Sequence, residues 1–350
     1  MRSDPGHRPG ESIRDVEQLE DLLSEPTEGV IRALAGVAGD VIVLGVSGKL
    51  GPTLARMARR ASDLGGVRRR VIGVARFGSD GQAERLAAHG VEVIRCDLLD
   101  PSHFDRLPEA PNVFFLAGMK FGSTGREATT WAVNTFLPGL IARKFRHGRI
   151  VALSTGNVYG LTPADGGGSR EGDPPDPRGE YAMSCLGRER IFEHFSRELE
   201  IPTALIRLNY ATEMRYGVLV DLALKVDAGE PIPLTMGSLN AIWQGDANAM
   251  TLRAIQHVGV PPTVLNVTGL ERLGVREVAE RFGRLLDREV TFEGVEAPDA
   301  LLSDARRALV LFEPPRVDAD RMIGWIADWV RRGGPTLGKP THFEARDGRF

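Results

Sequence analysis

The sequence has little of what marks disulfide-rich, metal-binding, membrane-spanning or nucleic-acid-binding proteins. It contains two cysteines, Cys96 and Cys185, and neither their number nor their spacing indicates a disulfide framework or a zinc site. The histidines show no pairing typical of metal ligands. No apolar run approaches the length of a membrane span. The basic triplet 68–70 is too short for a nucleic-acid-binding face and is interpreted as the solvated entry to a strand.

The composition is that of an ordinary globular protein. Charged residues make up 26% of the 350 positions and hydrophobic residues 42%, and the formal net charge is −3. The length allows two domains, or one domain with a substantial extension. Residues 1–10 are polar and contain proline and glycine, which is typical of neither a signal peptide nor an anchor. We therefore expect a cytoplasmic protein with no membrane or nucleic-acid partner and no metal.

A glycine-rich turn follows the first predicted strand. Residues 41–44 form a short apolar run rich in β-branched residues, which predicts a buried strand. Gly45, Gly48 and Gly51 come next, and a helical pattern begins after them. Strand, glycine turn and helix together are typical of a pyrophosphate-binding site, where glycines allow close approach and the helix offers unpaired N–H groups. The spacing is wider than Gly-x-Gly-x-x-Gly, so a plain tight turn is the alternative interpretation.

Strands and helices then alternate along the chain. Short apolar runs predict further strands at 71–74, 91–94, 113–116 and 150–153, with a long helix at 125–146. Such alternation predicts an α/β fold of the Rossmann type, in which a doubly wound parallel sheet is covered on both faces. Ligands of these sheets bind beyond the carboxyl ends of the strands. The residues directly after each strand are therefore the candidate site residues.

Two of these positions concern the choice of cofactor. Arg76 follows the second strand, where a fold that prefers NAD usually has an acidic residue, so an arginine favours the 2′-phosphate of NADP. The alternative is a surface arginine that leaves the choice between NAD and NADP open. Asp97 follows the third strand and is interpreted either as an acceptor for the adenine amino group or as the cap of a turn.

Small and polar residues follow the next two strands. Ala117 and Gly118 would let a cofactor lie close to the backbone, and Lys120 is a cation suited to phosphate. Thr155 follows the fifth strand, and Tyr181 begins a helix that extends to about residue 199.

Taken together, these motifs resemble the extended short-chain dehydrogenase/reductase superfamily, the NAD(P)-dependent sugar epimerases and dehydratases. The resemblance covers roughly residues 40–330. It rests on the Gly45–Gly48–Gly51 turn, Asp97-Leu98, Ala117-Gly118-Met119-Lys120, Asn134, Thr155 with Tyr159, Tyr181, and segments 206–210, 242–246 and 265–269.

The resemblance implies roles for several residues. Tyr181 would be the acid/base on a substrate hydroxyl or carbonyl while a hydride passes between the same carbon and the nicotinamide. Thr155 would hydrogen-bond the reacting oxygen, and Asn134 would support the helix and a proton relay. The family has a lysine four residues after the tyrosine, and this chain has Cys185 there.

The effect of the missing lysine on the pKa of Tyr181 follows from Coulomb's law. A cation about 5 Å from a phenolate, at an effective dielectric constant of about 20, contributes roughly 3 kcal/mol, or about two pKa units. A mostly neutral thiol cannot replace it. Two residues are candidates for the replacement cation, Lys120 in the same crevice and Arg188 two turns after Tyr181 on the same helix face.

The candidate residues fall into two further groups. The predicted cofactor-binding residues are Gly45, Ser47, Gly48, Lys49, Leu50, Gly51, Arg76, Asp97, Leu98, Ala117, Gly118, Lys120, Asn134 and Tyr181. The predicted substrate-binding residues are Asn157, Asn209, Tyr210, Arg215 and Trp243, each of which could equally belong to the core or an interface.

We expect four regions. Residues 1–38 form an N-terminal helical extension whose first 11 residues are disordered and whose helices, near 16–23 and 30–37, pack against the sheet. Residues 39–200 form the cofactor-binding domain, to which residues 240–268 return, and 201–332 form mainly a substrate lobe. Residues 333–350 are expected to be a loose tail; the alternative is that they cross the crevice and bring Lys339, His342 or Arg346 to an anionic substrate.

The sequence thus predicts an NAD(P)-dependent epimerase, dehydratase or oxidoreductase acting on a sugar or sugar-derived substrate. Two alternatives remain open, a catalytically degenerate NAD(P)-binding regulatory protein and an NADP-dependent reductase of non-sugar carbonyls. The resemblance also implies a homodimer formed through the helices at 125–146 and 181–199.

Overall fold

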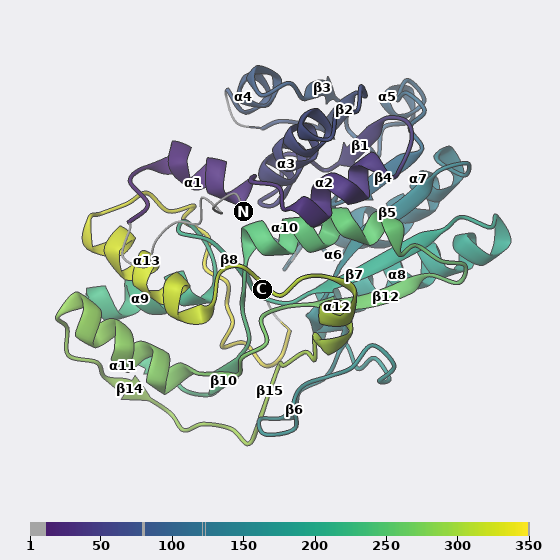
Figure 1. The fold of residues 1–350 in the computed structure, drawn as a ribbon. Coiled ribbons are helices and arrows are strands. Elements are labelled where there is room, and N and C mark those ends of the chain that lie inside the picture. The colour runs from purple at the N-terminus through teal and green to yellow at the C-terminus, as the bar shows by residue number, and fades with distance from the viewer. Residues whose placement is uncertain (1–11, 79–80, 121, 123, 349–350) are drawn as a thin grey trace.

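The computed structural model describes residues 12–78, 81–120, 122 and 124–348. The expected disorder of residues 1–11 falls outside the described residues. Two parts lie side by side in Figure 1, a large sheet with its helices to the right and a smaller helical lobe to the left.

The large part is built on a seven-stranded sheet in which every strand pair is parallel. Its strand order is β12-β7-β5-β4-β1-β2-β3. The strands are β1 (Val41–Leu44), β2 (Val71–Ala75), β3 (Glu92–Arg95), β4 (Asn112–Phe115), β5 (Arg149–Thr155), β7 (Thr203–Leu208) and β12 (Thr263–Val267). The predicted Rossmann-type fold is therefore confirmed, and β12 returns to the sheet from far along the chain.

Strand β1 shows why the sheet is covered on both faces. Val41 and Val43 pack into one hydrophobic cluster, while Ile42 and Leu44 pack into another on the opposite face. Helices α2 (Glu28–Ala35), α3 (Gly51–Leu64) and α10 (Gln244–Arg253) cover the first face, and α7 (Leu137–Lys144) and α8 (Gly179–Glu198) cover the second. Strand β3 is half-exposed, as expected of an edge strand.

The predicted helix at 125–146 is divided in three. Helix α6 (Glu127–Trp131) leads into a π-helical segment (Ala132–Phe136) and then into α7. Pro138 has no N–H to donate to the carbonyl of Asn134 one turn before it, and the wider turn occurs at this point. The Arg188 Nε–H donates to that carbonyl instead, at 3.4 Å.

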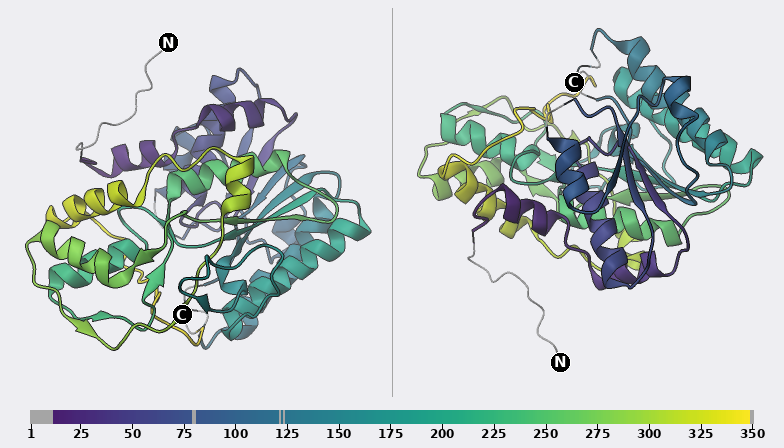
Figure 2. Two further views of the ribbon diagram at one scale, coloured as in Figure 1. Left: turned by 60° about the horizontal axis from the view of Figure 1, so that its bottom comes forward. Right: turned by 90° about the horizontal axis from the view of Figure 1, so that it is seen from above.

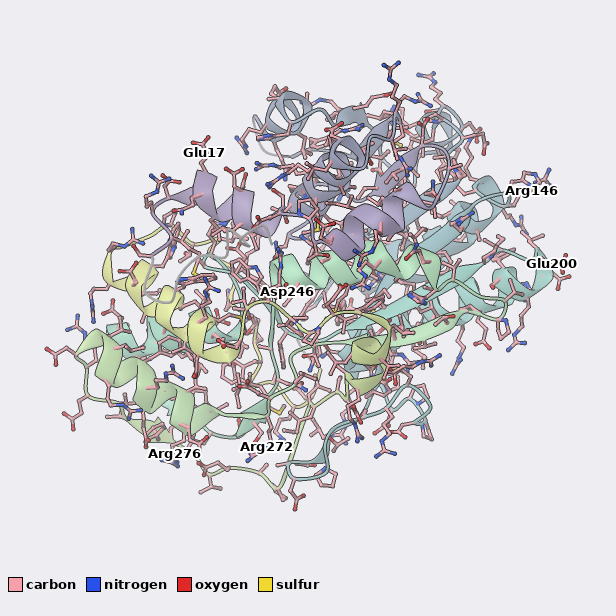
Figure 3. The ribbon with its side chains drawn as sticks, viewed as in Figure 1. Glu17, Arg146, Glu200, Asp246, Arg272 and Arg276 are labelled. Carbon is pink, nitrogen blue, oxygen red and sulfur yellow. The ribbon has the colours of Figure 1, made fainter. Side chains whose placement is uncertain are left out.

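The small lobe has its own hydrophobic core. Helices α9 (Val218–Ala228), α11 (Val275–Leu286) and α13 (Ala319–Arg331) pack together around it. Short strand pairs close the lobe: β9 (Ile232–Pro233) with β14 (Phe292–Glu293), and β10 (Ser238–Leu239) with β13 (Leu273–Gly274). Figure 3 shows Asp246 near the middle of the molecule, where its carboxylate accepts hydrogen bonds from Arg316 and from the Val317 N–H ahead of α13.

The N-terminal helices join the two parts. Helix α1 (Val16–Leu23) packs on α3 and α10, whereas Glu17 lies on its outer surface (Figure 3). The Glu20 carboxylate accepts from Arg56 of α3 at 3.2 Å and from Arg215, which precedes α9, at 3.1 Å. The second helix is α2, which begins after its N-cap Thr27, just beyond Pro26. The N-terminal extension therefore links the sheet to the small lobe and also packs on one face of the sheet.

The expectation of a loose C-terminal tail is wrong for the described residues. Residues 333–348, here called the C-terminal strap, leave α13 and end between the two parts (Figure 2). The Leu337 N–H donates to the Arg215 carbonyl, and both the N–H and the hydroxyl of Thr341 donate to Asp221 of α9. Phe343 is buried in the core of the small lobe. These contacts anchor the strap because a buried aromatic ring and a buried carboxylate both need protein partners.

Candidate active site

The glycine turn after β1 is built so that two of its positions admit no side chain. Gly45 has φ +87°, and a Cβ on it would lie 2.6 Å from the backbone of Ala117 after β4. A Cβ on Gly51 would lie 2.2 Å from the Val46 carbonyl oxygen. Gly48 has room, since the nearest atom to its Cβ would be 3.4 Å away. Steric contacts within the protein therefore explain why positions 45 and 51 are glycine, but they do not explain the glycine at position 48.

The turn leads directly into the N-terminus of α3, a helix of 14 residues. Leu50 is its N-cap and provides no side-chain hydrogen bond, so the first N–H groups of the helix are not capped by that side chain. Such a terminus attracts anions through its N–H groups and the helix dipole. A cradle without side chains at the start of a long helix fits a dinucleotide pyrophosphate.

Arg76 and Asp97 lie next to each other beyond β2 and β3. The guanidinium of Arg76 is 78% exposed and 3.8 Å from the Asp97 carboxylate. Asp97 Oδ1 also accepts from the Leu99 N–H, so this residue does cap a turn. The two side chains therefore lie at the edge where the ribose of a dinucleotide would be expected.

Thr155 and Tyr181 are brought together from the end of β5 and the first turn of α8. The Tyr181 hydroxyl is hydrogen-bonded to Thr155 and to Cys185, and Thr155 Oγ1 donates to Asn157 Oδ1 at 2.9 Å. Burial, with the nearby thiol, raises the pKa of Tyr181 well above 10, and Arg188 only partly opposes this. Burial likewise raises the pKa of Cys185, so its thiol is neutral at pH 7.

Lys120 reaches the same place from the end of β4. Its Nζ lies 5.9 Å from the centre of the Tyr181 ring and donates to the Thr341 carbonyl of the strap at 3.4 Å. Burial lowers the pKa of Lys120 to about 8. Its amino group is therefore mostly charged at pH 7; it lies over the Tyr181 ring and acts electrostatically on Cys185.

Arg188 carries its charge behind the tyrosine, on the sheet side. It donates to the Leu153 carbonyl at 2.6 Å and to Asn134 Oδ1 at 2.8 Å, and its guanidinium lies over the Phe115 ring. These bonds hold the guanidinium in place, so it acts on Tyr181 only through its electric field. Of the two candidate cations, Lys120 is the one whose charged end lies on the strap side of the ring.

Asn134 connects the elements around the site. Its side chain accepts from the Met119 N–H, and it donates to the Met119 carbonyl and to Ser184 Oγ of α8. It therefore fixes the segment that carries Lys120 against the helix that carries Tyr181. The resemblance implied such a supporting position, and its part in a proton relay stays a prediction.

A buried ion pair holds β5 against α8. Ser154, next to Thr155, donates to Glu189 at 2.5 Å, and Arg207 of β7 forms three hydrogen bonds to the same carboxylate. Arg207 also donates to the hydroxyl of the buried Tyr159 at 2.6 Å. Because all these groups are buried and satisfied, the spacing between Thr155 and Tyr181 is tightly fixed.

The predicted substrate residues form two groups. The first three lie beside Thr155 or directly after the end of β7. Asn157 lies beside Thr155, Asn209 donates to Asn240 Oδ1 next to the backbone of residue 156, and Tyr210 is a partly buried residue with φ +43°. The other two have structural positions. Arg215 is held by Glu213 and Glu20, and Trp243 is buried edge-to-face against Trp325.

Sequence reasoning missed the contacts between the glycine turn and the small lobe. Lys49 extends from the turn so that its Nζ lies 2.9 Å above the Tyr216 ring, and burial with the nearby Lys120 lowers its pKa to about 6. Asp221 of α9 and Lys339 of the strap also act on Lys49. No local pattern connects residues that are more than 160 positions apart, so the sequence carried no signal for this cluster.

The fold and this arrangement define a dinucleotide-binding α/β protein. The profile of the NAD dependent epimerase/dehydratase family matches residues 41–267, and the chain belongs to that family. No curated protein matches the sequence. Among the described residues there is neither a helix able to span a membrane nor a cluster of three potential metal ligands.

Solved structures share the fold at low sequence identity. A point mutant of UDP-glucuronic acid 4-epimerase from Bacillus cereus, in complex with UDP-4-deoxy-4-fluoro-glucuronic acid and NAD, has a TM-score of 0.71 at 16% identity, covering 84% of this chain and 99% of that one. UDP-glucose 4-epimerase from Thermotoga maritima gives 0.69 at 17%, with coverages of 84% and 99%. dTDP-glucose 4,6-dehydratase from Bacillus anthracis gives 0.68 at 16%, with coverages of 84% and 97%.

Alanine substitutions at two glycines, one in the turn and one in α13, should have opposite effects on the stability of the protein. Gly51→Ala places a Cβ against the Val46 carbonyl and should destabilise the protein by at least about 1–3 kcal/mol. Gly324→Ala, on the exposed side of α13 with open space around it, should stabilise by about 0.5–1 kcal/mol. Urea unfolding followed by circular dichroism measures both. Equal stabilities for the two variants would contradict this account of the turn.

Proposed function

We propose that this protein is an NAD(P)-dependent enzyme that acts on a sugar or sugar-nucleotide by epimerisation, dehydration or oxidoreduction. The observation that carries the proposal is the Thr155–Tyr181 hydrogen bond, with the amino group of Lys120 on the strap side of the Tyr181 ring. This group lies on the carboxyl side of β4 and β5, the same sheet edge as the glycine turn. Family membership supports the cofactor, and the solved sugar-nucleotide enzymes with the same fold support the substrate class.

Each residue has a defined task in this proposal. The turn and the start of α3 hold the pyrophosphate of the dinucleotide, which when bound accepts or returns a hydride. Tyr181 takes the proton from the substrate hydroxyl as the carbon is oxidised, and the Thr155 hydroxyl turns from Asn157 to donate a hydrogen bond to that oxygen. Both are fixed by the surrounding polar network, so little reorganisation is needed when charge develops.

Lys120 replaces the lysine that the family has at position 185. A charge about 6 Å from the centre of the Tyr181 ring, at an effective dielectric constant of about 20, would favour the phenolate by roughly 3 kcal/mol, in addition to the opposing effect of Arg188 on the raised tyrosine pKa. That is close to the contribution expected of a lysine in the helix. Burial of Tyr181 acts in the opposite direction and raises its pKa. The positive charge of a bound, oxidised nicotinamide would favour the phenolate further.

One observation favours a second function. Cys185 is a neutral, buried thiol hydrogen-bonded to the hydroxyl of Tyr181, and this contact raises the pKa of the tyrosine further. A protein that binds the dinucleotide without hydride transfer, and regulates another process, would tolerate this arrangement.

The decisive test uses Tyr181→Phe. We expect the purified protein to bind NAD or NADP and to turn over a sugar nucleotide from a panel of UDP- and dTDP-sugars. Tyr181→Phe should lower turnover by at least about 100-fold, because the acid/base is lost, while cofactor affinity stays within about twofold. Turnover by the variant at the wild-type rate would remove Tyr181 from the mechanism.

Cys185→Lys separates the two functions. If Lys120 has taken over, a second lysine beside it and Arg188 adds repulsion, and activity should fall. A large gain in activity would instead indicate that the chain is a decayed form of an active enzyme.

The pKa of Lys120 predicts the alkaline limit of activity. Its charge is present below about pH 8 and lost above it, so kcat/KM should fall as the pH rises through this range. Lys120→Arg keeps the charge and should move the alkaline limb upward by at least about one pH unit. Lys225→Arg on α9 is the control. An unmoved limb in Lys120→Arg would exclude Lys120 as the titrating group.

The choice between NAD and NADP depends on Arg76 in this proposal. Solved structures with the same fold, among them two of UDP-glucuronic acid 4-epimerase from Bacillus cereus, contain NAD and give no support to an NADP preference. The guanidinium of Arg76 is exposed, and Asp97 neutralises it only loosely, so it remains available to a 2′-phosphate.

Arg76→Ala should weaken NADP binding by about tenfold and leave NAD binding unchanged, because only NADP carries the 2′-phosphate. Calorimetric titration with each cofactor measures this. Arg68→Ala, an exposed arginine just ahead of the same strand, is the matched control. Unchanged NADP affinity in Arg76→Ala would show that the arginine is a surface residue only.

We also propose a homodimer through α6, the π-helical segment, α7 and α8. An apolar groove of about 650 Å³ runs over these helices, with Trp131, Ile191 and Phe195 among its walls. Phe136 in this groove is 61% exposed, which is unusual for a phenylalanine.

Phe136→Asp should convert a dimer into a monomer at micromolar concentration, because the charge would be buried in an apolar contact. Light scattering coupled to gel filtration gives the mass. Val310→Asp, which changes an even more exposed valine on α12 (Arg306–Leu311), should remain dimeric. A monomeric wild-type protein would contradict the proposal.

A further inference from the structure

Three lysines from three separate elements meet where the glycine turn faces the small lobe. Lys49 comes from the turn, Lys120 from the end of β4, and Lys339 from the C-terminal strap. Lys120 and Lys339 both act electrostatically on Lys49, and both lower its pKa. Like charges so arranged repel one another unless an anion lies among them.

The strap is anchored on both sides of Lys339. Two residues before it, the Leu337 N–H donates to the Arg215 carbonyl, next to the Tyr216 ring on which Lys49 lies. Two residues after it, Thr341 binds Asp221 and accepts from Lys120. Lys339 is therefore held between the position of Lys49 and the position of Lys120. Its side chain is exposed, so it can turn toward a ligand.

The nearby acidic groups oppose this charge only in part. Asp221 and Glu213 both act to raise the pKa of Lys49, but burial and the two other lysines outweigh them. Asp221 accepts two hydrogen bonds from Thr341, and Glu213 is engaged by Arg215. The N-terminus of α3 adds further positive potential at the same point. An ordered strap that brings a third lysine to this place, where Lys49 can take up a proton, therefore suits a ligand with more than one negative charge.

We propose that the C-terminal strap is part of the binding site and that Lys339 closes a three-lysine clamp, with Lys49 and Lys120, on the diphosphate of a nucleotide ligand. The proposal rests on the proposed function in that it assigns the ligand to this crevice. The diphosphate is that of the dinucleotide or of a nucleotide-sugar substrate. In either case the strap, which the family profile does not include, determines how tightly the ligand is held.

The test compares Lys339→Met with Lys225→Met in the full-length protein. Lys225 is a lysine of α9 that pairs with Glu230, outside the clamp. Calorimetric titrations use NAD, UDP-glucose and inorganic pyrophosphate as probes. We expect Lys339→Met to weaken pyrophosphate and one of the two nucleotides by about tenfold, and Lys225→Met to change nothing. The nucleotide that loses affinity identifies the source of the diphosphate.

A second readout is the proton taken up on binding. Lys49 faces Lys120, Lys339, Asp221 and Glu213, and with its pKa near 6 it is largely neutral in the unliganded protein at pH 8. A diphosphate beside it favours the charged form, so binding at pH 8 should take up about one proton. Titration in buffers of different ionisation enthalpy measures the uptake, and Lys49→Met should reduce it strongly.

The outcomes are distinct. If Lys339→Met binds all three probes as tightly as the wild type, the clamp is excluded while cofactor binding and the proposed function stand. If the wild type binds pyrophosphate through Lys339 but neither NAD nor UDP-glucose, the clamp stands and the proposed function fails. Proton uptake that is unchanged in Lys49→Met would exclude Lys49 from the clamp.

Discussion

The site depends on the close contact between the glycine turn and the segment after β4. Parallel pairing of β1 with β4 brings Gly45 against the backbone of Ala117, at a distance that leaves no space for a side chain. This contact places the start of α3 and the segment that carries Lys120 at one edge of the sheet. The candidate phosphate-binding elements and the candidate cation are therefore positioned by the same backbone packing.

The second constraint is the way in which the two parts are held together. Glu20 of α1 binds an arginine from each part, and the strap binds the small lobe through Thr341 and Phe343 while its carbonyl accepts from Lys120. Both terminal segments thus close the crevice from outside the family's common region. In an enzyme of this architecture, ligand access and lobe closure would be coupled to these segments.

Position 185 supplies no positive charge beside Tyr181, and a cation from another element lies over the Tyr181 ring. The thiol is neutral and buried, so it contributes packing and a hydrogen bond but no positive charge. Arg188 lies behind the ring, fixed by the backbone and by Asn134, and Lys120 lies over it. What matters for the phenol is the sum of the nearby charges, and this sum is not bound to one sequence position.

The alternation of short apolar runs and helical patterns determined the sheet and its two covered faces, because strand and helix periodicities are local. The same holds for the glycine turn and for Thr155, which follow strand ends that a parallel sheet brings to one edge. The pairing of Thr155 with Tyr181 was implied only by the family resemblance. The π-helical segment required knowledge of Arg188 beside Asn134, and the structural positions of Arg215 and Trp243 required the packing of distant helices. The ordered strap and the cluster of Lys49, Lys120 and Lys339 were decided only by the tertiary structure, since electrostatic and packing contacts between residues far apart in the chain leave no periodic trace in the sequence.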